Sequence, residues 1–266
     1  MTNTNPPENG HNYIEAGDGP PVVLLHGMGS SLHTWDKLIP ELTAAGYRVF
    51  ALDLLGHGHS LQPDDPERYH IDSYYEHFVD WLHSLDLDGS ISIIGHSMGA
   101  YLGLLYAQAH RDAVERLVLV DPYYSPVQLS QWLRRSARRH SLSGNILSAV
   151  PDWLIYPFVR LSPNVPSHMP DEMVQQLVRD YKRVHPNITA TVNTTRDLSE
   201  DLRQIHAEAL VIWGEKDYTL APGSFPRMLR RLPQAQARPI PQAGHMPHLS
   251  EAQQVAAVIL EFLDRV

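Results

Sequence analysis

Short apolar segments alternate with longer amphipathic ones along this chain, and that alternation constrains the fold more than any other feature of the sequence. Five apolar runs that end near a glycine or an aspartate lie at residues 22–25, 47–54, 90–94, 117–120 and 210–213. Such runs are typical of strands that are buried on both faces, as in a parallel sheet. Helical patterns separate them, at residues 35–45, 71–85, 98–109 and 251–263. The alternation predicts an α/β fold in which helices cover both faces of an open, mostly parallel sheet.

One connection between predicted strands is far longer than an ordinary crossover. Residues 122–208 separate the fourth apolar run from the fifth, and they contain helical patterns at 129–140 and 171–184. This stretch holds ten basic and eight acidic residues, whereas the rest of the chain is strongly acidic. We expect residues 122–208 to form a helical cap over the carboxyl ends of the strands, and residues 1–121 and 209–266 to form the core.

The composition of the chain excludes several classes of protein. The net charge of the 266 residues is −9, and because phosphate binding requires a basic surface, nucleic acid is not an expected partner. The absence of cysteine excludes disulfides, thiolate catalysis and cysteine-ligated zinc. No apolar run approaches the roughly 18 residues of a membrane span, and the N-terminal segment lacks a signal-peptide pattern. We therefore expect a cytoplasmic protein that does not bind membranes.

Neither a metal nor a cofactor is predicted. The closest histidine pairs are His57 with His59 and His245 with His248. Neither pair has the spacing of a helix-borne zinc motif. Gly56 and Gly58 begin a glycine-rich loop, but Leu61 stands where the dinucleotide-binding fingerprint requires its third glycine.

Residues 95–99, GHSMG, match the pattern G-x-S-x-G in the context that its chemistry requires. They follow an apolar run and open a helical pattern, so strand, tight turn and helix come in order. A side chain at either flanking glycine would collide with neighbouring backbone, and the turn thereby lifts the hydroxyl of Ser97 clear of the sheet. The helix directs its first amide groups and its positive dipole end at the site. The pattern predicts that Ser97 is a catalytic nucleophile.

A serine nucleophile needs a base, and the base needs a carboxylate that orients it. His245 lies just before the last helical pattern, and Asp217 follows the fifth apolar run. The chain order of Ser97, Asp217 and His245 is the order expected with a G-x-S-x-G nucleophile. Asp121 also ends a predicted strand and Glu215 lies beside Asp217, so both remain alternatives for the acid.

Attack on a carbonyl carbon creates an oxyanion, which preplaced N–H groups must stabilise. We expect one donor to be the backbone amide of Met98, the residue after the nucleophile. The second is expected from residues 26–29, HGMG, which follow the first apolar run, and the backbone amide of Met28 is the candidate. His26 is interpreted as a structural hydrogen-bonding residue under the site.

Five motifs of the chain together resemble the α/β-hydrolase superfamily, in its cap-bearing branch of esterases, lactonases and haloperoxidase-like enzymes. The motifs are residues 26–29 (HGMG), 53–60 (DLLGHGHS), 95–99 (GHSMG), 213–217 (WGEKD) and 244–248 (GHMPH). The resemblance implies an α/β-hydrolase fold with a mostly parallel, eight-stranded sheet, one antiparallel strand near the N-terminus, and a helical cap inserted after strand 6. It also supports Ser97, Asp217 and His245 as a triad. Haloalkane dehalogenases and epoxide hydrolases carry aspartate at the nucleophile position, so the likeness to them fails at Ser97.

The residues that select the substrate are less clearly marked. Aromatic side chains that can either line an apolar acyl pocket or simply pack are Trp35, Trp132, Trp153 and Tyr156. Four arginines that would share one helix face are Arg134, Arg135, Arg138 and Arg139. Such a face either attracts an anionic substrate or partner, or is solvated and paired with nearby acids. We favour the solvated face.

These observations predict a serine hydrolase that cleaves a small or medium carboxylic ester or lactone through an acyl-enzyme on Ser97. A C–C bond hydrolase or lyase and a cofactor-free perhydrolase are alternatives that would use the same triad. A ligand-binding or signalling protein with a hydrolase fold is an alternative from another class. The expected partner is the small-molecule substrate, and both a monomer and a homodimer are compatible with the sequence.

Overall fold

A seven-stranded sheet forms the centre of the computed structural model, which describes residues 10–129, 149–221 and 223–264. The strands are β1 (Tyr13–Ala16), β2 (Pro21–Leu25), β3 (Arg48–Leu52), β4 (Ile91–His96), β5 (Val114–Val120), β6 (Glu208–Gly214) and β7 (Ala235–Ile240). Their order in the sheet is β1-β3-β2-β4-β5-β6-β7. β1 pairs antiparallel with β3, and the other pairs are parallel. The predicted α/β class, with one antiparallel strand near the N-terminus, is confirmed.

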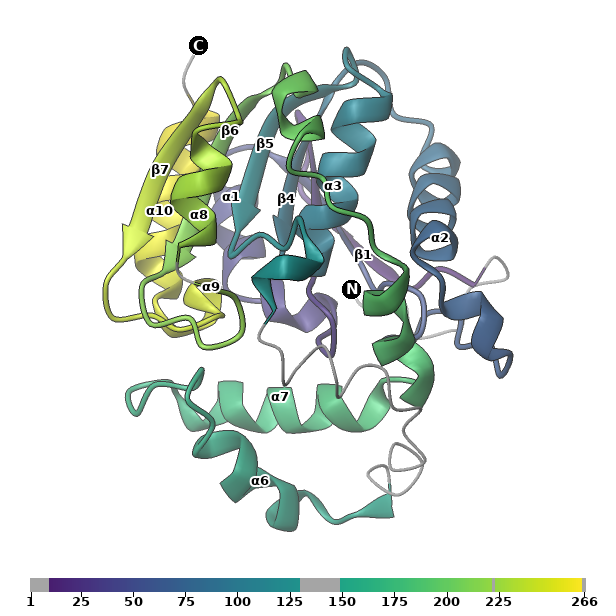
Figure 1. Ribbon diagram of the computed structural model, residues 1–266, viewed down its shortest axis with the longest axis vertical. Coiled ribbons are helices and arrows are strands. Elements are labelled where there is room, and N and C mark those ends of the chain that lie inside the picture. Colours follow the sequence, from purple (N-terminus) through teal and green to yellow (C-terminus); the bar gives the residue numbers. More distant parts are fainter. Residues whose placement is uncertain (1–9, 130–148, 222, 265–266) are drawn as a thin grey trace.

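Helices cover both faces of the sheet (Figure 1). The α-helices are α1 (Leu38–Ala44), α2 (Ile71–Ser84), α3 (Met98–Ala109), α6 (Asp152–Arg160), α7 (Asp171–Arg183), α8 (Ser224–Leu229), α9 (Pro247–Ser250) and α10 (Ala252–Leu263). Short 3-10 helices are η1 (Leu32–Trp35), η2 (Pro66–Tyr69), η3 (Pro126–Gln128), η4 (Pro186–Thr194) and η5 (Asp201–Gln204). Within the described ranges, none of the helices combines the length and the apolar character needed to cross a membrane.

Alternate residues of the central strands supply two separate apolar cores. Val23 and Leu25 pack in the cluster that contains residues of α2 and α3, whereas Val22 and Leu24 pack in the cluster that contains residues of α1 and α10. All four side chains are fully buried. Because both faces of these strands are covered, their sequences are continuously apolar rather than alternating.

The number of strands differs from the eight that the family resemblance implied. In the described part of the chain, the turn at residues 17–20 leads from β1 directly into β2, so a single strand precedes the parallel series. After β7 the chain enters α9 and α10, which adds no further strand. The long insertion consequently follows the fifth strand of this sheet and not the sixth.

The inserted segment forms α6 and α7 between β5 and β6, and α7 lies between the core and α6 (Figure 1). Apolar residues of both helices cluster with Met246 and Leu249, which come from the segment around α9 in the core. The two helices therefore lie beside the ends of the strands that carry the motifs. The boundaries of the cap at residues 122 and 208 stay a prediction.

Candidate active site

The turn between β4 and α3 holds Ser97 in a conformation that side chains rarely adopt. Its φ is +50° and its ψ is −109°, outside the regions that non-glycine residues favour. A Cβ on Gly99 would overlap the carbonyl oxygen of Leu25, and a Cβ on Gly95 would lie 2.6 Å from the amide nitrogen of Ala100. Both flanks therefore require glycine, for the steric reason that the sequence suggested.

Three side chains from separate loops meet at this turn. The hydroxyl of Ser97 donates to Nε2 of His245 across 3.1 Å, and Nδ1–H of His245 donates to Oδ2 of Asp217 across 2.8 Å. Oδ1 of Asp217 accepts the backbone amides of Thr219 and Leu220. Burial would raise the pKa of Asp217, but His245 and these two amides outweigh it and lower that pKa below its ordinary value. The ionised carboxylate fixes the imidazole tautomer that can take the proton of Ser97.

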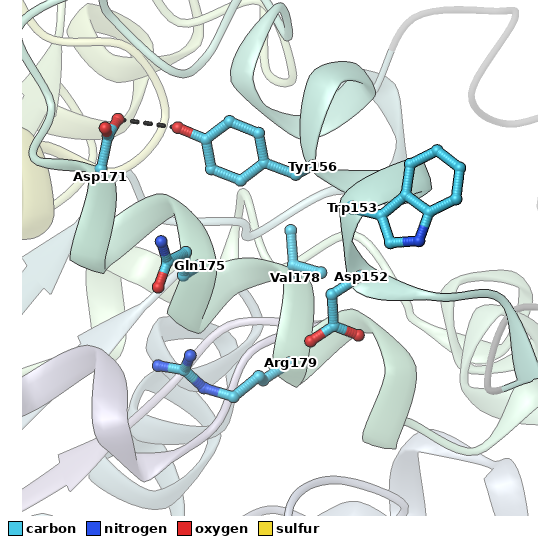
Figure 2. Close-up of a pocket in the computed structure, with 7 residues that line it drawn as sticks. All are labelled: Asp152, Trp153, Tyr156, Asp171, Gln175, Val178 and Arg179. Carbon is cyan, nitrogen blue, oxygen red and sulfur yellow. Dashed lines mark hydrogen bonds between the residues drawn. The ribbon is translucent and has the colours of Figure 1, made fainter.

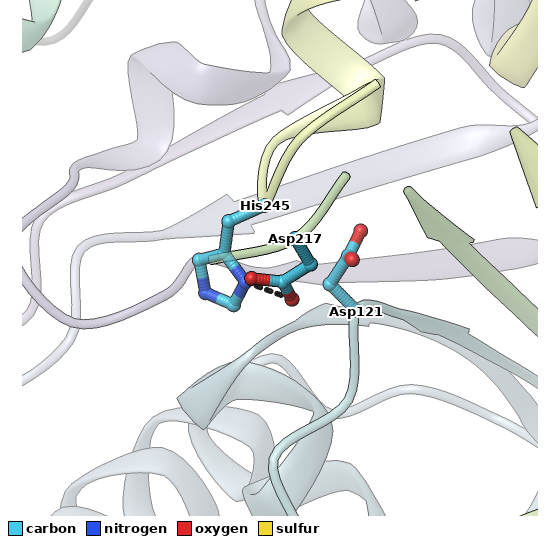
Figure 3. A group of neighbouring side chains, drawn as sticks. All are labelled: Asp121, Asp217 and His245. Carbon is cyan, nitrogen blue, oxygen red and sulfur yellow. Dashed lines mark hydrogen bonds and ion pairs between the residues drawn. The ribbon is translucent and has the colours of Figure 1, made fainter. Parts of the chain in front are cut away.

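Of the three acids considered, Asp217 bonds the imidazole (Figure 3). Asp121 lies beside this pair, where its Oδ1 accepts the backbone amide of Gly214 at 3.0 Å. Burial first, and the charge of Asp217 second, raise the pKa of Asp121 well above its ordinary value. Glu215 is exposed. The environment therefore keeps Asp217 ionised and favours the protonated form of Asp121.

One group of acids and histidines in the described residues has donor atoms close enough to hold a metal ion. It comprises Asp121, Asp217 and His245, whose donor atoms lie within 4.8 Å of one another (Figure 3). The imidazole is already bonded on both nitrogens, and each carboxylate accepts at least one backbone amide. These bonds match a buried acid and base pair better than a coordination sphere.

In the loop after β2, some backbone amides are hydrogen-bonded within the protein and others have no partner in the described residues. The amide of Gly29 donates to Nε2 of His57 at 3.0 Å, and the amide of Ser30 donates to the carbonyl oxygen of Gly27 at 3.2 Å. The amide of Met28 has no hydrogen-bond partner among the residues that the structure describes. The amide of Met28, the predicted donor, is therefore not committed to another acceptor in the described part of the chain.

The second predicted donor lies at the start of α3. Met98 is the first residue of this helix, so its amide has no acceptor within the helix. The positive end of the helix dipole lies at the same place and favours a negative charge there. Met98 directly follows the serine, and the residue before Met28 packs against it, since a Cβ on Gly27 would lie 3.1 Å from the Cβ of Ser97.

Two buried histidines support the loops around the site. Nε2 of His26 accepts the amide of Leu54, and its Nδ1–H donates to the carbonyl oxygen of Gly27. Nδ1–H of His57 donates to the carbonyl oxygen of Leu55. Burial lowers the pKa of His26 to about 4 and that of His57 to about 3, so both imidazoles are neutral at pH 7. Each ring is therefore one donor and one acceptor, which is the structural role expected of His26.

His96 contacts the loop that carries the base. Its Nε2–H donates to the backbone carbonyl oxygen of His245 at 2.8 Å, and its ring centroid lies 4.5 Å from that of His248. Burial, followed by His248 and His245, lowers the pKa of His96 well below its ordinary value. His96 occupies the variable second position of the G-x-S-x-G motif, so the motif alone carried no signal of this contact.

Helix α7 adds two contacts that the sequence analysis missed. Oδ1 of the buried Asp180 accepts the hydroxyl proton of Ser31 at 2.8 Å. A Cβ on Gly29 would lie 3.1 Å from the ring of Tyr181, so this ring lies against the loop that carries Met28. These contacts join segments about 150 positions apart, and a single sequence contains no local signal for them.

Among the described aromatic residues considered for a substrate pocket, Trp35 lies apart from Trp153 and Tyr156. Trp35 is fully buried in the core, and its ring centroid lies 4.7 Å from that of His248. Trp153 and Tyr156 line a groove of about 490 Å³ between α6 and α7 (Figure 2). The hydroxyl of Tyr156 donates to Asp171 at 2.7 Å. Trp132, Arg134, Arg135, Arg138 and Arg139 lie outside the described residues.

This groove lies on the side of α7 that faces away from the candidate site. Asp171, Gln175 and Val178 line the groove, whereas Asp180 reaches the core loop. At 100° per residue, Asp180 projects from the face of the helix opposite to the other three. The α7 helix therefore separates Trp153 and Tyr156 from the loop of Met28.

Sequence comparison relates the chain to enzymes of several activities. The family model described as the alpha/beta hydrolase fold matches residues 20–252. A 2-hydroxy-6-oxo-6-(2'-aminophenyl)hexa-2,4-dienoic acid hydrolase of Metapseudomonas resinovorans is 38% identical over 125 residues, which are 46% of this chain and 42% of that protein. A haloalkane dehalogenase of Mycobacterium marinum is 29% identical over 240 residues, which are 85% of this chain and 79% of that protein. The match to the first of these relatives thus spans less than half of its length.

Structural comparison extends the similarity over nearly the whole chain. A thermophilic esterase from Thermogutta terrifontis superposes with a TM-score of 0.80 and 24% sequence identity, covering 95% of this chain and 92% of that chain. Identity at this level establishes the fold alone. Because one fold carries many chemistries, the activity has to be argued from the side chains of the site.

Proposed function

Because the chain belongs to the alpha/beta hydrolase fold family, we propose that it is a serine hydrolase that cleaves a small or medium carboxylic ester or lactone. The observation that carries the proposal is the hydrogen-bonded chain from Ser97 through His245 to Asp217, with distances of 3.1 and 2.8 Å. The two backbone donors at Met28 and Met98 add the groups that the chemistry of a carbonyl requires.

The proposed reaction begins when Oγ of Ser97 attacks the carbonyl carbon and Nε2 of His245 takes the hydroxyl proton. The carbonyl π electrons move to the oxygen, which the amides of Met28 and Met98 stabilise. When the oxyanion collapses, the bond to the alcohol oxygen breaks and His245 returns its proton to that oxygen. Water, deprotonated by His245, then attacks the acyl carbon, releases the acid and restores Ser97.

The identity of the nucleophile argues against dehalogenation, the activity named for one relative. A carboxylate that displaces a halide forms an ester, which water can hydrolyse. A serine hydroxyl that displaced a halide would form an ether, which has no carbonyl for water to attack. The side chain of Ser97 therefore fits substrates that contain their own carbonyl group.

A C–C bond hydrolase is the second candidate, and the 38% identity to a dienoic acid hydrolase over 46% of the chain favours it. The same triad would serve, with a carbon atom as the leaving group. A panel of p-nitrophenyl esters of increasing acyl length, assayed beside lactones and a 2-hydroxy-6-oxohexadienoate, separates the two candidates. Turnover of the dienoate without ester hydrolysis would replace the first proposal with the second.

The central test compares Ser97→Ala with Ser92→Ala. Ser97→Ala is expected to abolish labelling by a fluorophosphonate and to lower kcat by about 10⁵-fold or more. Ser92→Ala removes a buried hydroxyl from β4, the strand that precedes the turn of Ser97, and should retain labelling and turnover. A wild-type protein that neither labels nor hydrolyses any carbonyl substrate would sink the proposal.

The choice of acid has its own test. Asp217→Asn should lower kcat by about 10⁴-fold, because an amide favours the wrong imidazole tautomer. Asp121→Asn should retain most of kcat, because an amide resembles the protonated carboxyl that the site favours. The reverse ranking of the two variants would assign the acid to Asp121.

A further inference from the structure

The segment between α6 and α7 returns to the core and contacts the loop that carries Asp217. Nδ2 of Asn164 donates to the hydroxyl of Thr219 at 2.8 Å, and Oδ1 of Asn164 accepts the backbone amide of Tyr218 at 3.0 Å. The amide of Tyr218 can only donate, so it fixes which end of the Asn164 side chain is the oxygen. One cap side chain thus bonds both residues that directly follow the acid.

The same cap residue also packs against the loop that carries the base. A Cβ on Gly244 would lie 3.0 Å from both the Cα and the carbonyl oxygen of Asn164, so these backbones approach closely. A Cβ on Gly214 would in turn overlap the carbonyl oxygen of Gly244. Gly244 directly precedes His245, and Asn164 therefore lies at the junction of the two loops that supply the acid and the base.

Thr219 links Asn164 to the carboxylate of Asp217, because it is hydrogen-bonded to both. The backbone amide of Thr219 donates to Oδ1 of Asp217 at 2.6 Å, while its hydroxyl accepts from Asn164. Movement of Thr219 would therefore weaken a bond that orients the carboxylate. Next to Asn164, Val165 is buried in the apolar cluster that also contains Met246, the residue after the base.

We propose that Asn164 is a positioning residue for the triad: from the cap, it holds the acid loop against the base loop and so links the position of the cap to the geometry of Asp217 and His245. The inference rests on the proposed serine hydrolase function. Asn164 does not touch the reacting atoms and acts through Thr219 and the backbone of Tyr218.

Asn164→Ala tests this role through kcat and through the proton between His245 and Asp217. We expect kcat for p-nitrophenyl acetate to fall by about 10- to 100-fold, because small misplacements of reacting groups are costly, while KM changes less than about twofold. The low-field proton NMR signal of Nδ1–H of His245 should shift or broaden. Thr219→Val removes only the hydroxyl, and its effect should not add to that of Asn164→Ala, because both variants break the same bond.

Two further variants separate positioning from general support of the cap. Asn164→Asp keeps an acceptor for the amide of Tyr218 and should recover part of kcat, with an acid limb of the pH profile that moves to higher pH because a negative charge is added near the base. His168→Ala breaks another cap contact, from His168 Nε2 to Glu251 at 2.5 Å, without touching either triad loop. Its kcat should stay within about twofold of the wild-type value.

Failure of the positioning role can be told apart from failure of the proposed hydrolase function. The NMR signal needs no substrate, so an unchanged signal in a folded Asn164→Ala protein overturns the positioning role even if the natural substrate is of another class. If Asn164→Ala does not fold, Thr219→Val and Asn164→Asp carry the same measurements. A change in KM alone, or equal losses in the Asn164 and His168 variants, would also refute the proposal.

Discussion

The core and the cap contact the candidate site by different physical means. In the core, the backbone itself is packed without spare room, since even a methyl group on Gly99 would overlap the oxygen of Leu25. In the cap, α7 and the segment before it reach the site through side chains such as Asn164, Asp180 and Tyr181, and backbone meets backbone where Asn164 approaches Gly244. The outer surface of α6 is open, with Trp153 71% exposed.

This difference separates the parts of the molecule that can vary from those that cannot. Close-packed backbone allows almost no substitution, whereas a side-chain hydrogen bond can be lost at a cost of about 1 kcal/mol. The exposed side chains of Trp153 and Phe158 on α6, and of Leu161 just after it, form a third level, because they lose little contact when they are replaced. A segment attached in this way can vary in sequence without loss of the core fold.

The largest expected effect is in the core. Gly99→Ala should destabilise the protein by about 3 kcal/mol or more, because the added methyl group meets a backbone oxygen that cannot move aside. Gly103→Ala is the matched control on the same helix, where the new Cβ would lie 3.2 Å from a side-chain methyl group of Ile93. Urea unfolding measures both. Equal stability of the two variants would contradict the close packing of backbone around the turn of Ser97.

The buried core histidines predict a loss of stability in acid. The pKa of His57 is about 3 when folded, against an ordinary value of 6.5, because burial disfavours its charged form. Between these values the unfolded chain binds more protons, so the free energy of unfolding falls as the pH falls, by about 1.4 kcal/mol per pH unit. His57→Gln cannot titrate and should reduce the slope by that amount between roughly pH 4 and 6. An unchanged slope would mean that His57 is charged in the native state.

Asp180, in the cap, changes the stability with pH in the opposite direction to His57. Burial raises the pKa of Asp180 from 3.8 to about 6, although Ser31, Gln176 and His33 favour its charged form; Asp53 opposes it. Between these values the native state binds more protons, so this residue makes stability fall as the pH rises from about 4 to 6, by up to 1.4 kcal/mol per pH unit. Asp180→Asn should remove that contribution in denaturant titrations across this range. If the variant and the wild type have parallel profiles, Asp180 is already ionised below pH 4.

The smallest effect is expected on the outside of the cap. Trp153→Ala should change the free energy of unfolding by less than about 0.5 kcal/mol, since surface substitutions of this kind remove few contacts. Its kcat/KM for p-nitrophenyl acetate should stay within about twofold of the wild-type value. A tenfold rise of KM confined to long acyl chains would instead place Trp153 in the path of the substrate, as the sequence analysis considered.

The core and its motifs were largely predictable because their signals are local. Continuous apolar runs marked β2 to β6, and the strand, turn and helix around Ser97 identified the strained turn that the structure contains. The strand count was less accessible, because β1 and β7 are short or half-exposed edge strands without a continuous apolar run. Chain order favoured Asp217 over Asp121, but both end a strand, and only their positions in space show which one meets His245.

By itself, the sequence determined the chain order of serine, aspartate and histidine, with the first two after apolar runs and the histidine before the last helix, because period, glycine placement and chain order are properties of adjacent residues. Only the tertiary structure decided which cap residues reach them. Asn164 and Asp180 contact loops far away along the chain, whereas Trp153 and Tyr156 face away from the serine. The direction in which a helix presents its side chains depends on how it packs, and packing is settled by the whole fold.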